Sequence, residues 1–140
     1  GTCGQIVIKA IEFMVAKYRS NPEQIIACIG PAISMECYDV NKDVSSFFQS
    51  LFYDFPEIIW KNPKTKKEHI DLKLANSILL QRSGLKAHHI EINPLCTYRS
   101  PSLLFSARRD GIECGRFSAG IMMSFLENYA SGTMGKLICK

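Results

Sequence analysis

Three arginines lie within nine residues near the end of the chain and could together hold an anion. They are Arg108, Arg109 and Arg116, and Asp110-Gly111 follows the first two as a predicted tight turn. A guanidinium group presents a planar fork of N–H donors that matches a phosphate or a carboxylate. The structural alternative is that Asp110 pairs with one arginine while the others are solvated or hold the turn. We predict the three arginines as substrate- or phosphate-binding residues.

The histidines and cysteines form no recognisable metal site. Zinc needs three or four His, Cys or carboxylate ligands at about 2.0–2.3 Å. The sequence has no C-x-x-C pair, and His69 is far from the other histidines. His88 and His89 are adjacent, so on a strand their side chains would point to opposite faces and could not share an ion. We predict no metal ligand in this chain, although ligands distant in sequence could still converge.

No catalytic residue stands out either. The chain lacks a G-x-S-x-G motif, and a cysteine nucleophile needs a histidine beside it in space. Cys96 is the cysteine nearest in sequence to His88 and His89, but a structural thiol is the simpler interpretation. Glu36 and Asp39 could act as acid and base, yet no second carboxylate pair supports them, and a capped, solvated loop is the simpler interpretation.

The net charge of +4 comes from one segment. Lys61, Lys64, Lys66 and Lys67 account for it, because the remaining charges balance. They surround a turn signal at Asn62 and have no interleaved aromatic residues on which bases could stack. The segment therefore predicts a solvated hairpin tip, and we expect no nucleic-acid partner.

Three amphipathic stretches predict the helices that would position these residues. The first runs from about residue 6 to 19, with apolar residues at helical spacing. The second follows Asn41, a predicted N-cap, and ends before Pro56. The third follows Asp71, another predicted N-cap, and stops at Gly84.

Short apolar runs predict strands between and after the helices. They are residues 25–29, 58–60, 88–92, 103–105 and 117–126. The first run is β-branched and closed by Gly-Pro, which predicts a strand buried on both faces. Because helices and strands interleave, the predicted fold class is α/β or α+β with mixed sheets flanked by helices.

Composition is that of one globular domain. The chain has 140 residues, of which 46% are hydrophobic and 21% are charged, so it can bury a core. No apolar run approaches the roughly 18 residues of a membrane-spanning helix, and no membrane partner is expected. Cys28 and Cys139 lie in apolar runs, where a reduced thiol behaves as a small hydrophobe. We therefore predict reduced thiols and a cytoplasmic location.

Four ordered blocks resemble the motifs of one family. Residues 29–40 resemble its G-P-[AS]-I-G-x-x-[CA]-[YF]-[ED]-V segment, and residues 70–84 resemble its D-L-x-x-A-N-x-x-x-L helix. Residues 96–97 and 105–116 resemble its C-T and F-[FS]-[SY]-x-R-R-D-G…G-R segments. These blocks are similar to the YfiH-like group, also called multicopper polyphenol oxidase or laccase-domain proteins. That group is regarded as zinc-dependent purine nucleoside phosphorylases.

The resemblance implies a fold and an activity. The family architecture is four-layered, α/β/β/α, with mixed sheets, and here it would be incomplete. Residues 1–126 would be the C-terminal part of the domain, and residues 127–140 would be a tail beyond the match. The implied reaction is phosphorolysis of adenosine, inosine, guanosine or methylthioadenosine, with adenosine deaminase activity. Purine nucleoside and phosphate are the implied substrates.

The resemblance also implies that the zinc ligands lie upstream of this chain. The family holds its metal with two histidines and a cysteine, in motifs such as E-Q-x-H-G, A-D-C and H-A-G-W-R-G. Gly1-Thr2 resembles the end of the last motif, so we expect none of these ligands here. Two departures stand out: Ser34 replaces the second glycine of G-P-A-I-G, and Ala107 stands where the family usually has Tyr.

The expected partner is the N-terminal portion of the same domain, which would carry the zinc. On this interpretation the chain alone is inactive, and zinc belongs to the complete domain. The alternative is a non-catalytic scaffold half that needs an N-terminal partner segment to cover its apolar faces. The three histidines make a copper oxidase implausible. Homo-oligomerisation is left open.

Overall fold

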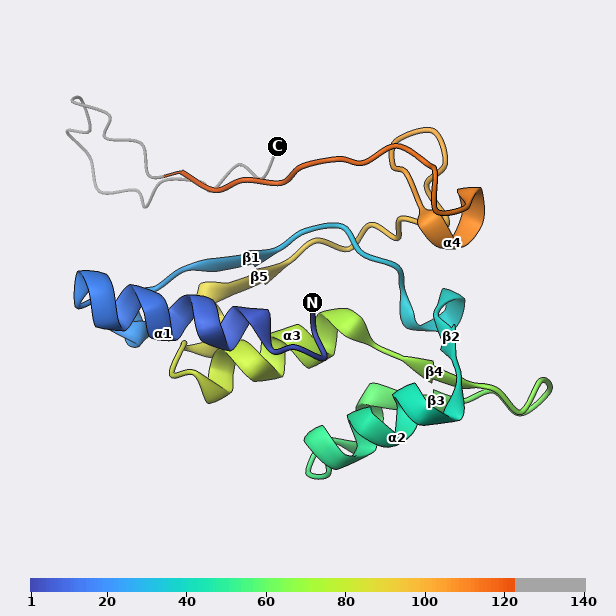
Figure 1. Ribbon diagram of the computed structural model, residues 1–140, viewed down its shortest axis with the longest axis horizontal. Coiled ribbons are helices and arrows are strands. Elements are labelled where there is room, and N and C mark those ends of the chain that lie inside the picture. Colours follow the sequence, from blue (N-terminus) through green and yellow to red (C-terminus); the bar gives the residue numbers. More distant parts are fainter. Residues whose placement is uncertain (123–140) are drawn as a thin grey trace.

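The computed structural model describes residues 1–122, which form a mixed α/β fold (Figure 1). The helices and strands are, in chain order, α1 (Ile6–Tyr18), β1 (Ala27–Ile29), β2 (Asp39–Val40), α2 (Lys42–Leu51), β3 (Ile59–Lys61), β4 (Glu68–Ile70), α3 (Leu72–Arg82), β5 (Ile90–Ile92) and α4 (Ala107–Asp110). The predicted mixed α/β class is confirmed over these residues. In the described part of the chain, no helix is both long and apolar enough to cross a membrane.

The described strands form a parallel pair and an antiparallel sheet. Strands β1 and β5 pair in parallel, with Ala27 opposite Ile90 and Ile29 opposite Ile92. Strands β2, β4 and β3 form the antiparallel sheet, in that order. The chain between β1 and β5 contains this whole sheet together with α2 and α3. In Figure 1, α1 and α3 lie below the parallel pair, and the segment after α4 runs above it.

Helix α3 lies between two apolar clusters. Leu79 belongs to the first cluster, in which α2, α3 and the antiparallel sheet pack around the stacked rings of Phe48 and Phe52, 5.7 Å apart. Leu80 belongs to the second cluster, where it meets Ile11 of α1 beneath the parallel strands. Burying such side chains is the main favourable contribution to folding. Helix α3 therefore holds the two sheets in one structure.

Helix ends follow local chemistry. Asp71 Oδ1 accepts hydrogen bonds from the N–H groups of Lys73 and Leu74, at 3.0 and 2.9 Å, so the predicted N-cap of α3 is confirmed. The predicted stop at Gly84 is also confirmed, because this residue has a φ of +94° that favours glycine. Asn41 occupies the N-cap position of α2, but its side chain makes no capping hydrogen bond.

The first predicted strand is shorter and less buried than expected. Only Ala27–Ile29 of residues 25–29 form β1, and these residues are half-buried. Burial on both faces is therefore wrong for the described part. The physical reason is that, within residues 1–122, this parallel sheet consists of two strands, so little of it is interior.

Two further strand predictions fail or lie partly outside the described residues. Residues 103–105 are turn and loop, because the N–H groups of Leu103 and Leu104 bond to the carbonyl of Ser100. Residues 117–122 have no regular secondary structure, whereas 123–126 and the predicted tail lie outside the described residues. Apolar composition alone does not distinguish a strand from an apolar loop.

The two adjacent histidines differ from the sequence prediction. His88 and His89 end a short 3-10 turn, Ala87–His89, and β5 begins only at Ile90. Their rings lie edge to face with centroids 4.4 Å apart. The prediction that they point to opposite faces of a strand is therefore wrong.

Candidate functional site

Two loops leave the parallel strands β1 and β5 at the same edge of their sheet. Residues 30–34 follow β1, and residues 93–97 follow β5. Ala32 and Cys96 form a parallel bridge, and the N–H of Thr97 donates to the carbonyl of Ala32 at 3.2 Å. Ligands of α/β proteins commonly bind at the carboxyl ends of parallel strands. This edge is therefore the candidate site.

A cavity of about 550 Å³ opens beside these loops, a size typical of small-molecule sites. It is lined by Ile33, Tyr38, Thr97, Phe105, Ser106, Ala107, Arg108 and Ile112. The lining combines two aromatic rings, three hydroxyl groups and one guanidinium group. We call it the α4 cavity, because α4 supplies two of its residues. Such a wall could bind a flat apolar group beside an anion.

Arg108 lines the α4 cavity, and one nitrogen of its guanidinium group is bound to Asp39. Its Nη1 donates to Oδ1 of Asp39 at 2.9 Å and to the carbonyl oxygen of Asp39 at 3.0 Å. Its guanidinium carbon lies 5.2 Å from the centre of the Tyr38 ring, a cation–π distance. The side chain is still 41% exposed, so an anion in the cavity could reach it.

Arg109 closes the loop that carries the cavity wall. Its Nη1 donates to the carbonyls of Thr97 and Tyr98 at 2.7 and 2.9 Å, and its Nη2 donates to that of Leu104 at 2.8 Å. A bidentate ion pair with Asp110, at 2.7 and 2.6 Å, completes its contacts. These hydrogen bonds raise the pKa of Arg109 and lower that of Asp110. Arg109 is not part of the cavity lining.

Arg116 holds the turn after α4. Its Nη2 donates to the carbonyl of Ile112 at 2.8 Å, and its Nη1 donates to the carbonyls of Cys114 and Gly115. The predicted turn at 109–111 is the end of α4 followed by Gly111, whose φ is +86°. Of the three predicted arginines, the structure thus places Arg108 at the cavity. The side chains of Arg109 and Arg116 instead bind backbone carbonyls of the loops before and after α4.

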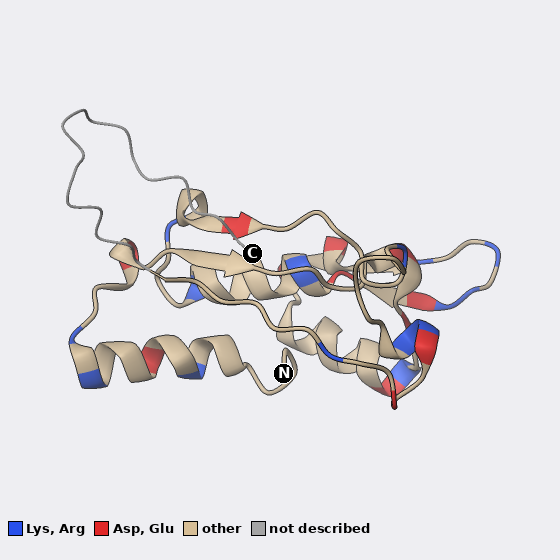
Figure 2. Ribbon diagram, turned by 90° about the horizontal axis from the view of Figure 1, so that it is seen from above, with Lys and Arg blue, Asp and Glu red and all other residues tan. Residues whose placement is uncertain are grey.

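Asp39 connects the α4 cavity to the lysine-rich hairpin. Its Oδ2 accepts from Nζ of Lys67 at 2.6 Å, while its Oδ1 accepts from Arg108. The hydrogen bond from Lys67, supported by the charges of Lys67 and Arg108, lowers the pKa of this carboxyl group. Figure 2 shows the hairpin lysines and the charged residues of α4 at the same end of the molecule. Sequence reasoning treated Asp39 and the lysines separately and missed this connection.

The hairpin itself is confirmed. Strands β3 and β4 pair in an antiparallel register, with Lys61 opposite Glu68. Oδ1 of Asn62 accepts from the N–H groups of Lys64 and Thr65 at 2.9 and 3.2 Å, which closes the turn. The predicted solvated tip is confirmed, because residues 63–67 are exposed. Lys67 in addition forms an ion pair with Asp39, while its side chain stays 62% exposed.

Cys96 carries a polarised thiol next to the cavity wall. The N–H and Oγ–H of Ser34 donate to its Sγ at 3.3 and 3.0 Å. Burial raises the pKa of the thiol, but the hydrogen bonds from Ser34 and from the following backbone lower it, with a net value of about 7. Ser34 and Cys96 are 62 residues apart, so no local signal reveals the pair.

The described residues do not fit a zinc site. No three His, Cys, Asp or Glu side chains of residues 1–122 converge as metal ligands. Cys3, Cys37, Cys96 and Cys114 are free thiols, as predicted. Cys28 is disulfide-bonded, so the prediction of a reduced thiol is wrong there.

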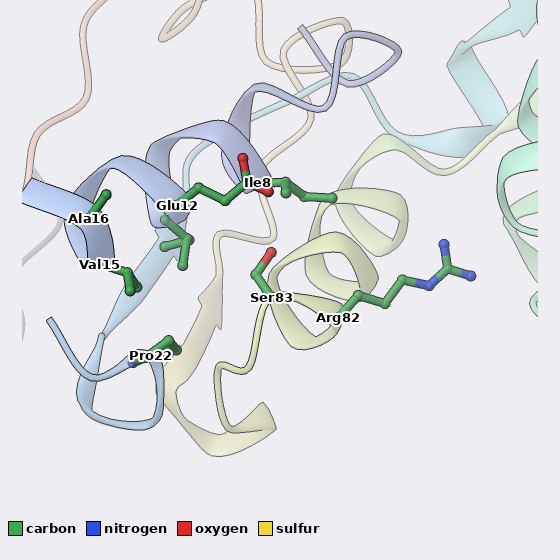
Figure 3. Close-up of a pocket in the computed structure, with 8 residues that line it drawn as sticks. Ile8, Glu12, Val15, Ala16, Pro22, Arg82 and Ser83 are labelled. Atoms are coloured by element: carbon green, nitrogen blue, oxygen red, sulfur yellow. The ribbon is translucent and has the colours of Figure 1, made fainter. Parts of the chain in front are cut away.

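A smaller cavity of about 350 Å³ lies between α1 and the end of α3 (Figure 3). Its lining is Ile8, Ile11, Glu12, Val15, Ala16, Pro22, Arg82 and Ser83. Figure 3 shows the guanidinium group of Arg82 pointing away from the other lining residues, and it bonds instead to Asp54 and to the carbonyl of Leu51. The lining lacks a convergent set of polar groups, so the α4 cavity is the better candidate.

Comparison with known proteins places the chain in a family. Residues 1–124 match the family described as Multi-copper polyphenol oxidoreductase laccase. The chain is 37% identical over 123 residues to "Purine nucleoside phosphorylase" of Bacteroides thetaiotaomicron, covering 88% of this chain and 46% of that protein. It is 35% identical over 121 residues to "Adenosine deaminase RL5" of an unknown prokaryotic organism, covering 86% of this chain and 46% of the relative.

The fold is also similar to that of a solved structure, hypothetical protein YfiH of Bacillus licheniformis. The TM-score is 0.73 at 34% identity, with 79% of this chain and 42% of that chain covered. The chain thus spans less than half the length of these relatives. It belongs to the multi-copper polyphenol oxidoreductase laccase family, the YfiH-like group that includes curated purine nucleoside phosphorylases.

Proposed function

We propose that this chain is the C-terminal part of a zinc-dependent purine nucleoside phosphorylase. The enzyme would cleave adenosine, inosine, guanosine and methylthioadenosine, and would also deaminate adenosine. Support comes from the similarity to a purine nucleoside phosphorylase and to an adenosine deaminase. Because the chain spans less than half of each, the activity is proposed for the complete domain.

The proposed function also implies a domain organisation, a zinc site and a location for the whole protein. Residues 1–126 would belong to a four-layer α/β/β/α domain, and residues 127–140 would form a tail. The zinc would be held by the N-terminal portion of that domain, since the described residues of this chain do not fit the metal. A cytoplasmic location is the last part of the proposal, because four of the five described cysteines are free thiols and Cys28 alone of them is disulfide-bonded.

Phosphorolysis requires a site that binds both phosphate and a nucleoside. An oxygen of phosphate attacks C1′ of the ribose, the C–N bond to the purine breaks, and its electron pair leaves with the base, which gains a proton. The products are ribose 1-phosphate and the free purine. A site for this reaction must hold a dianion against the sugar and support a flat base. We assign no proton transfer to a residue of this chain.

The α4 cavity offers groups of the required kinds. Arg108 is the proposed principal phosphate ligand, because it lines the cavity and is partly exposed. The rings of Tyr38 and Phe105 would border the base. Arg109 and Arg116 complete the proposed phosphate-binding set, where they would add positive charge and hold the loop. The observation that carries the proposal is one exposed guanidinium beside two aromatic rings in a cavity of suitable size.

The test is a titration of the polypeptide with inorganic phosphate and, separately, with inosine, followed by NMR. Signals of Thr97 and Ser106 should shift, and Arg108→Met should weaken phosphate binding about tenfold. Arg99→Met is the matched control, because Arg99 is exposed in the segment between β5 and α4 and does not line the cavity. Equal effects of the two substitutions, or no phosphate-dependent shift at all, would contradict the role of Arg108.

The second candidate is a non-catalytic scaffold half that needs a partner segment. It is favoured by large apolar side chains exposed between residues 103 and 122, among them Leu103, Ile112 and Met122 at 71, 76 and 84%. An assay of inosine and adenosine cleavage by the complete domain, with zinc supplied, separates the two candidates. Arg108→Met should slow phosphorolysis if this chain contributes to the catalytic site, whereas an unchanged rate would favour the scaffold.

A further inference from the structure

One carboxylate is shared by two cations from distant parts of the chain. Oδ1 of Asp39 accepts from Arg108 at 2.9 Å, and Oδ2 accepts from Lys67 at 2.6 Å. The two cations are 69 and 28 residues away from Asp39 in sequence. The lysine hairpin is thereby coupled to the wall of the α4 cavity through a single side chain.

The carboxylate is the fixed member of this triad. Asp39 lies in β2, opposite His69 of β4, and its side chain is only 30% exposed. The side chains of Lys67 and Arg108 are 62% and 41% exposed. Long exposed side chains change rotamer easily. Either cation can therefore adjust while Asp39 stays in place.

An anion in the cavity would compete with Asp39 for Arg108. The strength of that competition depends on how strongly the negative charge of Asp39 attracts Arg108. Lys67, bound to Oδ2 of the same carboxylate, weakens this attraction. We propose that Lys67 is a positioning residue that keeps Arg108 available to an anion by balancing Asp39. This inference rests on the proposed function of Arg108. Without the lysine charge, Arg108 would be the single cation bound to Asp39 and would be held more strongly by it. Anion binding by Arg108 would therefore be weaker.

The same hairpin provides a matched control for this contact. Lys64 carries the same charge at the hairpin tip, but its side chain has no ion pair with Asp39. Lys42 bonds to Glu68, at 3.1 Å, and not to Asp39. A long-range effect of net charge would be nearly the same for Lys64 and Lys67, because both lie on one hairpin. A contact effect would appear at Lys67 only.

The experiment titrates the polypeptide with inorganic phosphate at constant ionic strength and reads the Kd by NMR. Lys67→Gln should raise the Kd about two- to fivefold, as expected for an exposed ion pair, while Lys64→Gln changes it much less. Lys67→Arg should restore the original value, because it keeps the charge. Asp39→Asn should lower the Kd, and in that background Lys67→Gln should act no more strongly than Lys64→Gln.

The outcomes separate this inference from the proposed function. Amide spectra of every variant first establish that the fold is intact. If Arg108→Met weakens phosphate binding but Lys67→Gln and Lys64→Gln have equal effects, the role of Lys67 is overturned and that of Arg108 stands. If the unmodified chain binds no phosphate, both are overturned. An undiminished Lys67→Gln effect in the Asp39→Asn background also refutes the coupling.

Discussion

Ser34 donates two hydrogen bonds, from its N–H and its Oγ–H, to the buried sulfur of Cys96. The contact joins the loop after β1 to the loop after β5, where the parallel strands end. Cys96 is 8% exposed, so few solvent molecules compete with these donors. The thiolate form is therefore stabilised inside the fold, with a pKa of about 7.

Ser34→Ala should raise the pKa of Cys96. The substitution removes the Oγ–H donor at 3.0 Å but keeps the backbone donor, so the pKa should rise from about 7 partway to the ordinary thiol value. Thiolate absorbance or the ¹³Cβ shift of Cys96 against pH measures it. Ser83→Ala is the control, because Ser83 bonds to Leu79 and not to a thiol. An unchanged pKa in Ser34→Ala would show that the hydroxyl does not stabilise the thiolate.

Stability should depend on pH through the same thiol. The folded-state pKa of Cys96 lies below that of the unfolded chain, so the thiolate contributes stability above the unfolded value of 9.0. This contribution is lost as pH falls through about 7. Urea unfolding should show a gain on the order of 2 kcal/mol between pH 6 and 9 that Cys96→Ala lacks. The same pH dependence in both proteins would exclude Cys96 as its source.

Asp71→Ala should destabilise the fold by about 1 kcal/mol, because it leaves the N–H groups of Lys73 and Leu74 without their capping acceptor. Urea unfolding measures the loss. Asn41→Ala is the matched control at the start of α2, where the side chain makes no capping bond, and it should cost much less. Equal costs at the two positions would contradict the capping interpretation.

Arg109→Met should loosen the loop between Thr97 and Asp110. It removes donors to the carbonyls of Thr97, Tyr98 and Leu104, so we expect the urea midpoint of unfolding to fall. Hydrogen exchange at the Ser106 amide, which bonds to Asp110, should become faster. If phosphate binding falls while stability and exchange stay unchanged, Arg109 would be a direct ligand rather than a support.

Much of the fold could be predicted from local sequence. Helical spacing of apolar residues located α1, α2 and α3, and the turn residues Asn62 and Gly84 marked a hairpin tip and a helix stop. Residues 103–105 are apolar, yet they form a turn and loop in which Leu103 and Leu104 bond to Ser100 and the carbonyl of Leu104 accepts from Arg109. The loop depends on contacts that local periodicity does not contain.

The candidate site was predicted only in part. The arginine cluster indicated the segment that borders the cavity, but spacing in the sequence does not distinguish Arg108, Arg109 and Arg116 from one another. In the structure only Arg108 lines the cavity, because carbonyl groups and Asp110 occupy the donors of Arg109. Whether the guanidinium N–H groups of an arginine are already bound depends on which carbonyl groups the folded chain brings beside them.

The sequence by itself determined the interleaved helices and strands, the caps and turns, and the family, since all of these depend on residue type at short spacing. Only the tertiary structure decided that Ser34 meets Cys96 and that Lys67 and Arg108 share Asp39. The members of these pairs are 28 to 69 residues apart in sequence. They meet because β5 returns to pair in parallel with β1, and because β4 of the hairpin pairs with β2. Contacts between such distant segments arise from the closing of the sheets and not from the local pattern.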